Sequence, residues 1–472
     1  MTKQLTDLTP ANENPWYVLM TLYGDDQELN RKTWNAWAGQ ALTKDQSNKV
    51  QFSPYFEELH MWDKLKDGIE KKFSDKVMEQ EVGLGLPVEF PSACSAVNMK
   101  QLDLKNRIDL SGFTFPRCVE FSASVFGSDL HAHQAIFLSR VSFSNTKLEH
   151  GLFLNNVKFH EHAIFEKAEL SGFSSFEQAT FVKEAIFHNS KFRDRCSFRY
   201  AEFQNNAQFL GSVFGDEVDF TGGLFDNSVL FERTRFQGRA FFMHRKFTMK
   251  NAAESEVPNF RECHFEMPAN FSEAEFSISY PDFADSILHD KTTFTKNTKQ
   301  CTYWPDKTQQ DLQQAKSSCA TIRHVLAKQG LAEEEHFFFR REMQFASKIG
   351  SFGQKLPYLI FGWLSDYGHS IARPLVGLAI VWAVGFACFW GFFAGCCVPK
   401  PSIVIDRPFG SAIGLSFSNL FPLFGFNRLY FGAEFMKFLP ASLKAISSIQ
   451  TVVSLPLLFF LGLGLRQRFR LR

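Results

Sequence analysis

Few side chains in this sequence have the types and spacing that chemistry requires. Two histidine pairs, His131 with His133 and His160 with His162, are two positions apart, which in a strand directs both imidazoles to one face. Such a pair can bind a metal ion, although polar pairs on a strand surface are far commoner than metal sites. The sequence contains no glycine-rich phosphate loop, no Gly-x-Ser-x-Gly, no His-Glu-x-x-His and no paired carboxylates that stand out. We therefore expect no enzyme activity, no cofactor and no metal site.

A second group of polar side chains lies inside uncharged, apolar sequence near the end of the chain. Polar groups at membrane depth persist only where protein or a wet cavity satisfies them. We expect this group to line a pore between several copies of the chain, and the alternative is that it packs against neighbouring helices. Its members are Ser416, Ser418 and Asn419 in the segment 408–427, and Gln450 and Thr451 in the run 445–465.

Length, charge and cysteine usage exclude several classes of protein. The chain has 472 residues, enough for several domains, and a formal net charge of +1. This balance argues against a nucleic-acid partner and against an acidic mimic of DNA. Nine cysteines without a Cys-x-x-Cys pair form neither a disulfide framework nor a zinc site, so we expect reduced or buried thiols. The polar first residues lack the apolar core of a signal peptide, and we expect no cleaved leader.

The middle of the chain repeats phenylalanine at intervals that alternate between five and six residues. In an α-helix, steps of five and six would place successive rings roughly 140° and 240° apart, on both sides of the helix. A helix therefore offers no single stripe to bury. We expect the following members of the unbroken series to form a core: Phe181, Phe187, Phe192, Phe198, Phe203, Phe209, Phe214, Phe220, Phe225, Phe231, Phe236 and Phe242.

The residue two positions before each of these phenylalanines is nearly always small, as at Ala185, Ser190 and Ala201. Residues two apart point to the same face of a strand, so each unit offers one large and one small inward side chain. Four such units make a coil of about 22 residues, and coils stacked about 4.8 Å apart place ring on ring. The sequence therefore predicts a mainly β fold, a solenoid whose core is built by stacking.

These units of a small residue, any residue and Phe resemble the pentapeptide-repeat proteins, and the resemblance extends from Leu104 to Phe283. It implies a right-handed quadrilateral β-helix. The sequence departs from the family pattern by one extra residue in every second unit, which we expect to bulge alternate corners. The series begins weakly at Leu104, Leu110, Phe115, Phe121 and Phe126, and it slips around His131. It resumes at Phe137, Phe143, Leu148, Phe153, Phe159, Phe165, Leu170 and Phe176. After a break at 248–259, which we expect to be a loop, it returns at Phe260, Phe265, Phe271 and Phe276.

Helical sequence flanks the predicted solenoid on both sides. An open solenoid has two apolar ends that need cover, and the tryptophan-bearing N-terminal part is expected to form a helical cap. Two further helices are predicted at 306–329, ended by Gly330, and at 331–348, with acidic residues first and basic residues last. The predicted organisation is a cap over 1–97, a solenoid over 98–300, a helical hairpin over 301–350 and a membrane module over 351–472.

The predicted membrane module has two apolar runs that are long enough to span a bilayer, at about 374–398 and 445–465. The segment 408–427 between them is also uncharged, but proline and glycine interrupt it, so we expect a re-entrant helix. Basic residues cluster before the first run and after the second, which favours a cytoplasmic position for both flanks and for the solenoid.

This C-terminal arrangement resembles a two-span ion-channel unit found in a subset of bacterial pentapeptide-repeat membrane proteins. The carbonyl-rich potassium filter is absent, and Phe421 to Phe426 stand in its place. The resemblance implies a multi-pass protein of the bacterial cytoplasmic (inner) membrane with both termini in the cytoplasm. Our first functional hypothesis is an oligomeric, channel-like protein whose solenoid senses or docks a partner. The alternative is a membrane-anchored scaffold without transport activity. In either case the expected partners are the lipid bilayer, further copies of the chain and an unknown cytoplasmic protein, with no nucleic acid.

Overall fold

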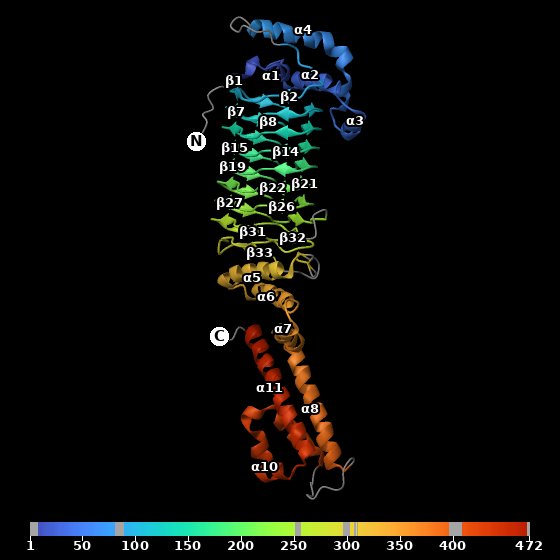
Figure 1. Ribbon diagram of the computed structural model, residues 1–472, viewed down its shortest axis with the longest axis vertical. Coiled ribbons are helices and arrows are strands. Elements are labelled where there is room, and N and C mark those ends of the chain that lie inside the picture. The colour runs from blue at the N-terminus through green and yellow to red at the C-terminus, as the bar shows by residue number, and fades with distance from the viewer. Residues whose placement is uncertain are drawn as a thin grey trace. The chain divides into compact units, whose positions relative to one another are not determined.

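The computed structural model describes residues 8–80, 89–250, 256–295, 303–305, 308, 310–395 and 408–469. The chain divides into two compact units, Met1–Phe338 and Phe339–Arg472, which we call the solenoid unit and the helical unit. In the solenoid unit, strands of two or three residues stack in a column with α-helices at each end (Figure 1). The predicted β-solenoid with flanking helices is therefore confirmed.

Every strand pair in the solenoid is parallel, and the described strands form four sheets, one for each wall. The first sheet holds β1 (Thr9–Pro10), β3 (Leu102–Leu104), β7 (Val125–Phe126), β11 (Lys147–Leu148), β15 (Glu169–Leu170), β19 (Lys191–Phe192), β23 (Val213–Phe214), β27 (Arg235–Phe236) and β30 (His264–Phe265). The second holds β2 (Val97–Asn98), β6 (Val119–Glu120), β10 (Val141–Ser142), β14 (Ala163–Ile164), β18 (Ala185–Ile186), β22 (Ala207–Gln208) and β26 (Val229–Leu230). The third holds β4 (Ile108–Asp109), β8 (Leu130–His131), β12 (Leu152–Phe153), β16 (Ser174–Ser175), β20 (Cys196–Ser197), β24 (Val218–Asp219), β28 (Ala240–Phe241), β31 (Ala269–Phe271) and β33 (Thr293–Phe294). The fourth holds β5 (Thr114–Phe115), β9 (Ile136–Phe137), β13 (Lys158–Phe159), β17 (Thr180–Phe181), β21 (Glu202–Phe203), β25 (Leu224–Phe225), β29 (Lys246–Phe247) and β32 (Glu275–Phe276).

The coil length equals the period of the phenylalanine series. Phe181 pairs with Phe203 and Phe203 with Phe225, so strand partners are 22 residues apart (203 − 181 = 22). The stacked rings of these two pairs lie 4.7 and 4.9 Å apart between centroids. All twelve phenylalanines from Phe181 to Phe242 in the unbroken series are buried. Each wall thus encloses its own column of stacked rings.

A left-handed backbone conformation recurs at alternate corners of the coil, within the five-residue intervals of the phenylalanine series. Positive φ angles recur every eleven residues, and an L side chain adopts this conformation at a cost. Glycine and asparagine tolerate it best, but lysine, tyrosine and arginine also occur. The corner residues are Ala123, Gln134, Asn145, Asn156, Lys167, Gln178, Asn189, Tyr200, Gly211, Gly222, Arg233 and His244.

Two details of the expected core are wrong. The series does not slip at His131, because Leu130 and Ala132 are the inward residues of that unit. The large residue comes first there and the small one second, the reverse of the order in most other units. Phe153 is not a core residue, since its neighbours Leu152 and Leu154 are the fully buried ones and Phe153 faces outward. Because three successive residues are apolar, the sequence pattern does not show which of them points inward.

After the break in the phenylalanine series, the next coil stacks in register on the coil before the break. Phe260 stacks on Phe231 with ring centroids 4.9 Å apart, although these two residues are 29 positions apart rather than 22 (260 − 231 = 29). The seven additional residues therefore leave the column of rings intact. The expected loop at 248–259 lies partly outside the described residues, which omit 251–255.

The N-terminal segment covers one end of the column, in agreement with the predicted cap. Trp34 is fully buried, stacks on Phe113 and donates its indole N–H to the carbonyl of Thr114 at 3.0 Å. The Asn35 amide donates to Gly112 O and accepts from Thr114 N, so it replaces a missing strand partner. The elements of the cap are η1 (Ala11–Glu13), α1 (Pro15–Met20), α2 (Gln27–Gly39), α3 (Lys44–Val50), η2 (Phe56–His60) and α4 (Trp62–Gln80).

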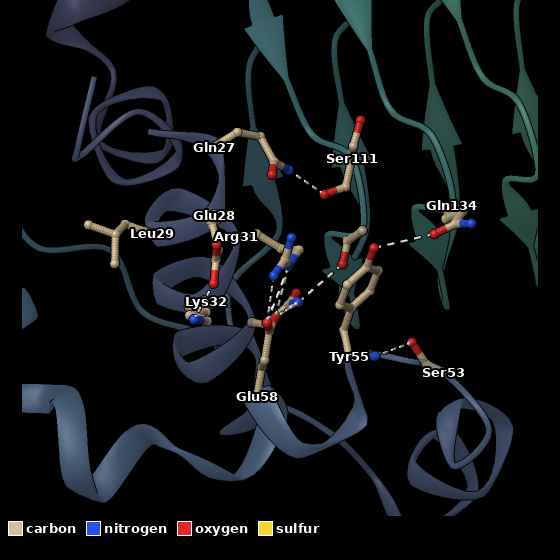
Figure 2. Close-up of polar contacts among 12 residues, drawn as sticks. Gln27, Glu28, Leu29, Arg31, Lys32, Ser53, Tyr55, Glu58, Ser111 and Gln134 are labelled. Atoms are coloured by element: carbon tan, nitrogen blue, oxygen red, sulfur yellow. Dashed lines mark hydrogen bonds and ion pairs between the residues drawn. The ribbon is translucent and has the colours of Figure 1, made fainter. Parts of the chain in front are cut away.

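Figure 2 shows the polar side of this contact. Tyr55 reaches across to Gln134 with its hydroxyl, and its ring lies under the guanidinium of Arg31 at 4.3 Å. Arg31 in turn pairs with the partly buried Glu58 at 3.0 Å. Gly112 has a φ of +71°, and a Cβ there would lie 2.4 Å from the Tyr55 ring, so glycine is required where the cap meets the first coil.

The opposite end of the column is covered by Trp304 and by α5 (Leu312–Gln329). Trp304 stacks on Phe276 at 4.7 Å and meets Phe338 edge to face at 4.9 Å. Asp311 caps α5 by accepting from two backbone N–H groups, and Gly330 ends it in a left-handed conformation. The helix therefore begins later than the predicted residue 306. The next helix, α6 (Ala332–Ala346), starts with three glutamates, as predicted from its charge pattern.

The helical unit contains two helices that are long and apolar enough to cross a membrane, α8 (Ala372–Phe393) and α11 (Ala441–Phe469). Only 17% and 22% of their most apolar windows are buried within the protein, unlike the core helix of a water-soluble domain. The two run side by side (Figure 1). The remaining elements are α7 (Phe352–Ser365), α9 (Pro408–Leu420), η4 (Pro422–Phe424) and α10 (Phe426–Phe438).

Candidate functional site

A layer of polar side chains crosses the apolar interior of the helical unit. It lies where α9 packs against both α8 and α11. Apolar clusters lie on either side of it, one around Phe389 and Leu415 and the other around Leu378 and Leu457. We call it the polar layer, and its side chains are Ser416, Asn419, Asn427, Ser447, Gln450 and Ser454.

Gln450 is the centre of the polar layer. Its amide N–H groups donate to Ser416 Oγ at 2.7 Å and to the α8 carbonyl of Val381 at 3.0 Å. Its amide oxygen accepts from Asn419 Nδ2 at 2.9 Å. Gly385 on α8 makes room for this amide, because a Cβ there would lie 2.1 Å from Gln450 Nε2. One side chain on α11 thus joins all three helices.

Asn419 on α9 is the second residue of the polar layer that bonds several others. Its side-chain oxygen accepts from Asn427 Nδ2 at 2.8 Å and from Ser447 Oγ at 2.9 Å. Ser416 Oγ, one turn earlier, donates to the α8 carbonyl of Trp382 at 2.7 Å. These bonds satisfy polar groups that would otherwise be costly in an apolar environment.

The five residues predicted to line a pore occupy different environments. Ser416, Asn419 and Gln450 are buried and bonded to one another in a single chain. Ser418 is also buried, but its hydroxyl donates to Leu415 O within its own helix. Thr451 is half-buried and donates to Ser447 O one turn earlier. The structure therefore brings three of the five together and leaves two in local contacts.

Ser447, Ser454 and Asn427 belong to the polar layer but were not among the predicted site residues. A signal was present for two of them, because Ser447, Gln450 and Ser454 follow the spacing of one helix face. Nothing local marks Asn427, which reaches the layer from the first turn of α10.

The first histidine pair lies on the outer surface of the solenoid, in a group of aromatic side chains. His131 Nδ1 and His133 Nε2 are 3.5 Å apart, as expected for one strand face. The His131 ring stacks on Phe153 at 4.6 Å, and Phe173 lies 6.1 Å farther along. Burial, and next the nearby Arg107, lower the pKa of His131. We call His131, His133, Phe153 and Phe173 the aromatic patch.

The second histidine pair does not share a strand face. His160 and His162 lie in the corner between β13 and β14 rather than within a strand. His162 Nδ1 is 3.5 Å from the carboxylate of Glu184, whereas burial and the nearby Lys49 lower the pKa of His160. Among the described residues, no group of three or more His, Cys, Asp or Glu side chains could hold a metal ion.

Comparison with known proteins supports the repeat assignment. Residues 154–202 and 176–224 match the model of a family described as pentapeptide repeats (9 copies). No curated protein and no solved structure matches the chain. The matched residues include the unbroken series from Phe181 to Phe220, and their strands belong to all four sheets. The centre of this chain is therefore pentapeptide-repeat sequence folded as a parallel four-sided β-solenoid.

Proposed function

We propose that the chain is a membrane-anchored scaffold, in which α8 and α11 cross a bilayer and the solenoid unit binds a protein partner outside it. Pentapeptide-repeat solenoids are generally non-catalytic structural or interaction modules. The described residues of the two helices are uncharged along their apolar windows and expose most of that surface. A bilayer is the solvent that suits such a surface.

The polar layer is the observation that carries this proposal. A side chain that lines a pore between copies must face outward from its own chain, toward water. Asn419 and Gln450 instead point into the bundle of one chain, and their hydrogen bonds close there. Interhelical hydrogen bonds of this kind join membrane helices to each other. These hydrogen bonds support a structural role for the side chains of the polar layer. That role favours a membrane anchor over a pore.

Two spans return the chain to the side from which it entered. Basic residues flank the first span at Arg340, Arg341 and Lys348 and the second at Arg466. Basic flanks favour the cytoplasmic side of a bacterial inner membrane. Under the proposal the solenoid unit is therefore cytoplasmic, and so is its partner.

The aromatic patch is the part of the solenoid surface best suited to bind a protein. Phe153 lies half-buried on a wall where the paired positions of the next coils carry Ser175, Ser197 and Asp219, and the half-buried Phe173 lies in the adjoining corner. Aromatic side chains are enriched at the centres of protein interfaces, where they bury much surface at little cost in conformational entropy. A photo-crosslinking residue at Phe153 should capture a specific cytoplasmic protein, whereas one at Gln204 on another wall should not. Equal capture at both positions would contradict docking at the patch.

The anchor is tested by thiol accessibility and by electrical recording. The nine native cysteines are first replaced, and a single cysteine is then placed at Asn419 or, as an exposed control, at His369. A membrane-impermeant thiol reagent should modify the control from the cytoplasmic side and should leave position 419 unmodified from both sides until the protein is denatured. Purified protein in planar bilayers should be electrically silent.

One observation favours a second candidate, the oligomeric channel-like protein. The helix α9 lies against both spans, as a re-entrant pore helix would. In that case several copies must surround an axis, and the residues of the polar layer must turn toward water. Reproducible single-channel currents, together with modification at position 419, would replace the anchor by this candidate.

A further inference from the structure

The helix α7, just before the first span, carries an exposed apolar stripe. Phe352 and Trp363 are 74% and 78% exposed, far more than is usual for such large apolar side chains. At 100° per residue, the exposed apolar positions fall within an arc of about 100° along the helix. The members of the stripe are Phe352, Leu356, Leu359, Ile360 and Trp363.

The opposite face of α7 is the one that packs against the rest of the helical unit. Phe361 stacks on Phe460 of α11 at 5.3 Å and meets Tyr367 edge to face. Arg373 Nη1 donates to the carbonyl of Gly362 at 2.8 Å. The exposed stripe is therefore not a core face awaiting its partner within the unit, because the core face of this helix is already packed.

Both ends of α7 are defined, so the stripe has a fixed length and position. Ser351 and Gln354 form a capping box at the start. Asp366 ends the helix in a left-handed conformation, and its carboxylate binds Arg340 at 2.6 Å. Six residues later α8 begins, so the stripe is continuous along the chain with the first span.

The length and composition of α7 indicate what the stripe contacts. A helix of 14 residues is about 21 Å long, too short to cross a hydrocarbon core of about 30 Å. An amphipathic helix of this length can instead lie in the plane of the membrane surface, and tryptophan is enriched there. Lys348 and Lys355 lie beside the stripe in sequence and complement anionic lipid headgroups.

We propose that α7 is an interfacial helix, whose stripe inserts between lipid headgroups and sets the depth of the adjoining span. The inference rests on the proposed membrane anchoring and adds a third contact with the bilayer to it. The stripe would also fix how the chain leaves the membrane surface before α8.

Photoactivatable lipids test this inference on the chain without any substitution. The protein is reconstituted into liposomes of phosphatidylcholine and phosphatidylglycerol that contain a lipid with a diazirine close to the glycerol, or at the end of its acyl chain. After illumination, adducts are mapped by mass spectrometry. The shallow probe should label Phe352, Ile360 and Trp363, and the deep probe should label exposed residues within the spans, such as Val384 and Val453.

The outcomes separate the inference from the proposed function. Adducts on α8 and α11 with none on α7 would overturn the interfacial helix and leave the anchor standing. In a parallel cysteine-free sample with a single cysteine in place of Trp363, oxidation that forms disulfides between two copies, together with an absence of lipid adducts on α7, would assign the stripe to a second copy and also overturn the inference. An absence of adducts on all three helices would overturn membrane anchoring itself.

A matched pair of variants adds a second readout. Trp363→Glu places a charge on the stripe and should abolish the shallow adducts on α7 while the adducts on α8 and α11 persist. Gln354→Glu places the same charge on the opposite face and suits the capping box, so it should leave the adducts unchanged. Equal labelling of α7 in both variants would contradict insertion of the stripe.

Discussion

Asn419 and Gln450 join their side-chain amides in a hydrogen bond of 2.9 Å, which ties the short helix α9 to the long helix α11 in the apolar interior of one chain. Each amide also bonds a third element, Asn419 through Asn427 and Gln450 through the carbonyl of Val381. The pair therefore holds the segment between the two spans in place.

Breaking this pair should destabilise the helical unit. Asn419→Leu leaves the Asn427 amide N–H and the Ser447 hydroxyl without their acceptor and the Gln450 amide oxygen without its donor. We expect a loss of about 1–3 kcal/mol. Thermal unfolding in detergent measures the loss. Ser448→Ala is the control, because the exposed Ser448 only bonds the carbonyl one turn earlier, and it should have no measurable effect. Equal unfolding temperatures for the two variants would show that the polar layer contributes no stability.

The ring columns of the solenoid should behave as a packed core. Phe203 stacks between Phe181 and Phe225, so Phe203→Ala should cost about 3–5 kcal/mol through lost contacts and a cavity. The adjacent Gln204 is exposed, and Gln204→Ala should change stability by no more than about 0.5 kcal/mol. Thermal denaturation followed by circular dichroism compares the two, and a similar loss in both would contradict the inward and outward assignment.

The solenoid could be predicted because its geometry repeats in the sequence. Each side of a coil has room for one large inward side chain, so the period of the chain is the period of phenylalanine. The prediction failed at Leu152, Phe153 and Leu154, where three successive apolar residues fit either face. At these positions the pairing with the neighbouring coils determines which side chain points inward. Phe153 pairs with His131 and Ser175 and therefore faces outward.

The polar layer was only partly predictable. Polar residues inside apolar segments are conspicuous, and Ser416, Asn419 and Gln450 were found by that signal. Whether such groups meet partners in their own chain or in another copy depends on how three helices cross. That crossing depends on details such as the absence of a side chain at Gly385, which no local pattern links to Gln450.

The left-handed corners predict a stabilising substitution. Lys167 is exposed and has a φ of +55°, a conformation that costs an L side chain about 1 kcal/mol or more. Lys167→Gly should therefore raise the melting temperature slightly, despite the loss of its exposed ion pair with Glu166. The same substitution at Lys158, in the extended strand β13, should lower stability by about 0.5–1 kcal/mol. A fall in melting temperature for both variants would contradict the strain at this corner.

Two partly buried histidines should make the folded protein less stable in mild acid. Burial is the main cause that lowers the pKa of His131 and of His160 in the folded protein. The unfolded chain therefore takes up protons first, so stability is complete above the ordinary pKa of about 6.5 and falls as the pH drops through it. The double variant His131→Phe, His160→Phe should lose less melting temperature than the native protein between about pH 7.5 and about pH 5. Parallel losses in the two proteins would remove these histidines as the cause.

Among the charged residues of the solenoid, we expect substitution of Arg245 to have the largest effect on stability. It occupies an inward position that is small in most coils, and it is fully buried with its guanidinium 4.0 Å from the centre of the Phe225 ring. Burial lowers the pKa of Arg245 to about 9, so the group stays charged at neutral pH. It donates to the carbonyls of Gly222 and Leu224, at a corner where two successive glycines have positive φ angles.

Arg245→Ala would leave a cavity and two carbonyls without these donors, and we expect it to cost about 2–4 kcal/mol. Arg245→Lys should recover part of the loss, because a single ammonium cannot span two carbonyls as a planar guanidinium does. The exposed Arg239 in the same coil is the control, and Arg239→Ala should stay within about 0.5 kcal/mol of the native protein. Chemical denaturation of the four proteins gives the ranking. If Arg245→Ala unfolded at the same denaturant concentration as Arg239→Ala, the guanidinium would not be what holds the double-glycine corner closed.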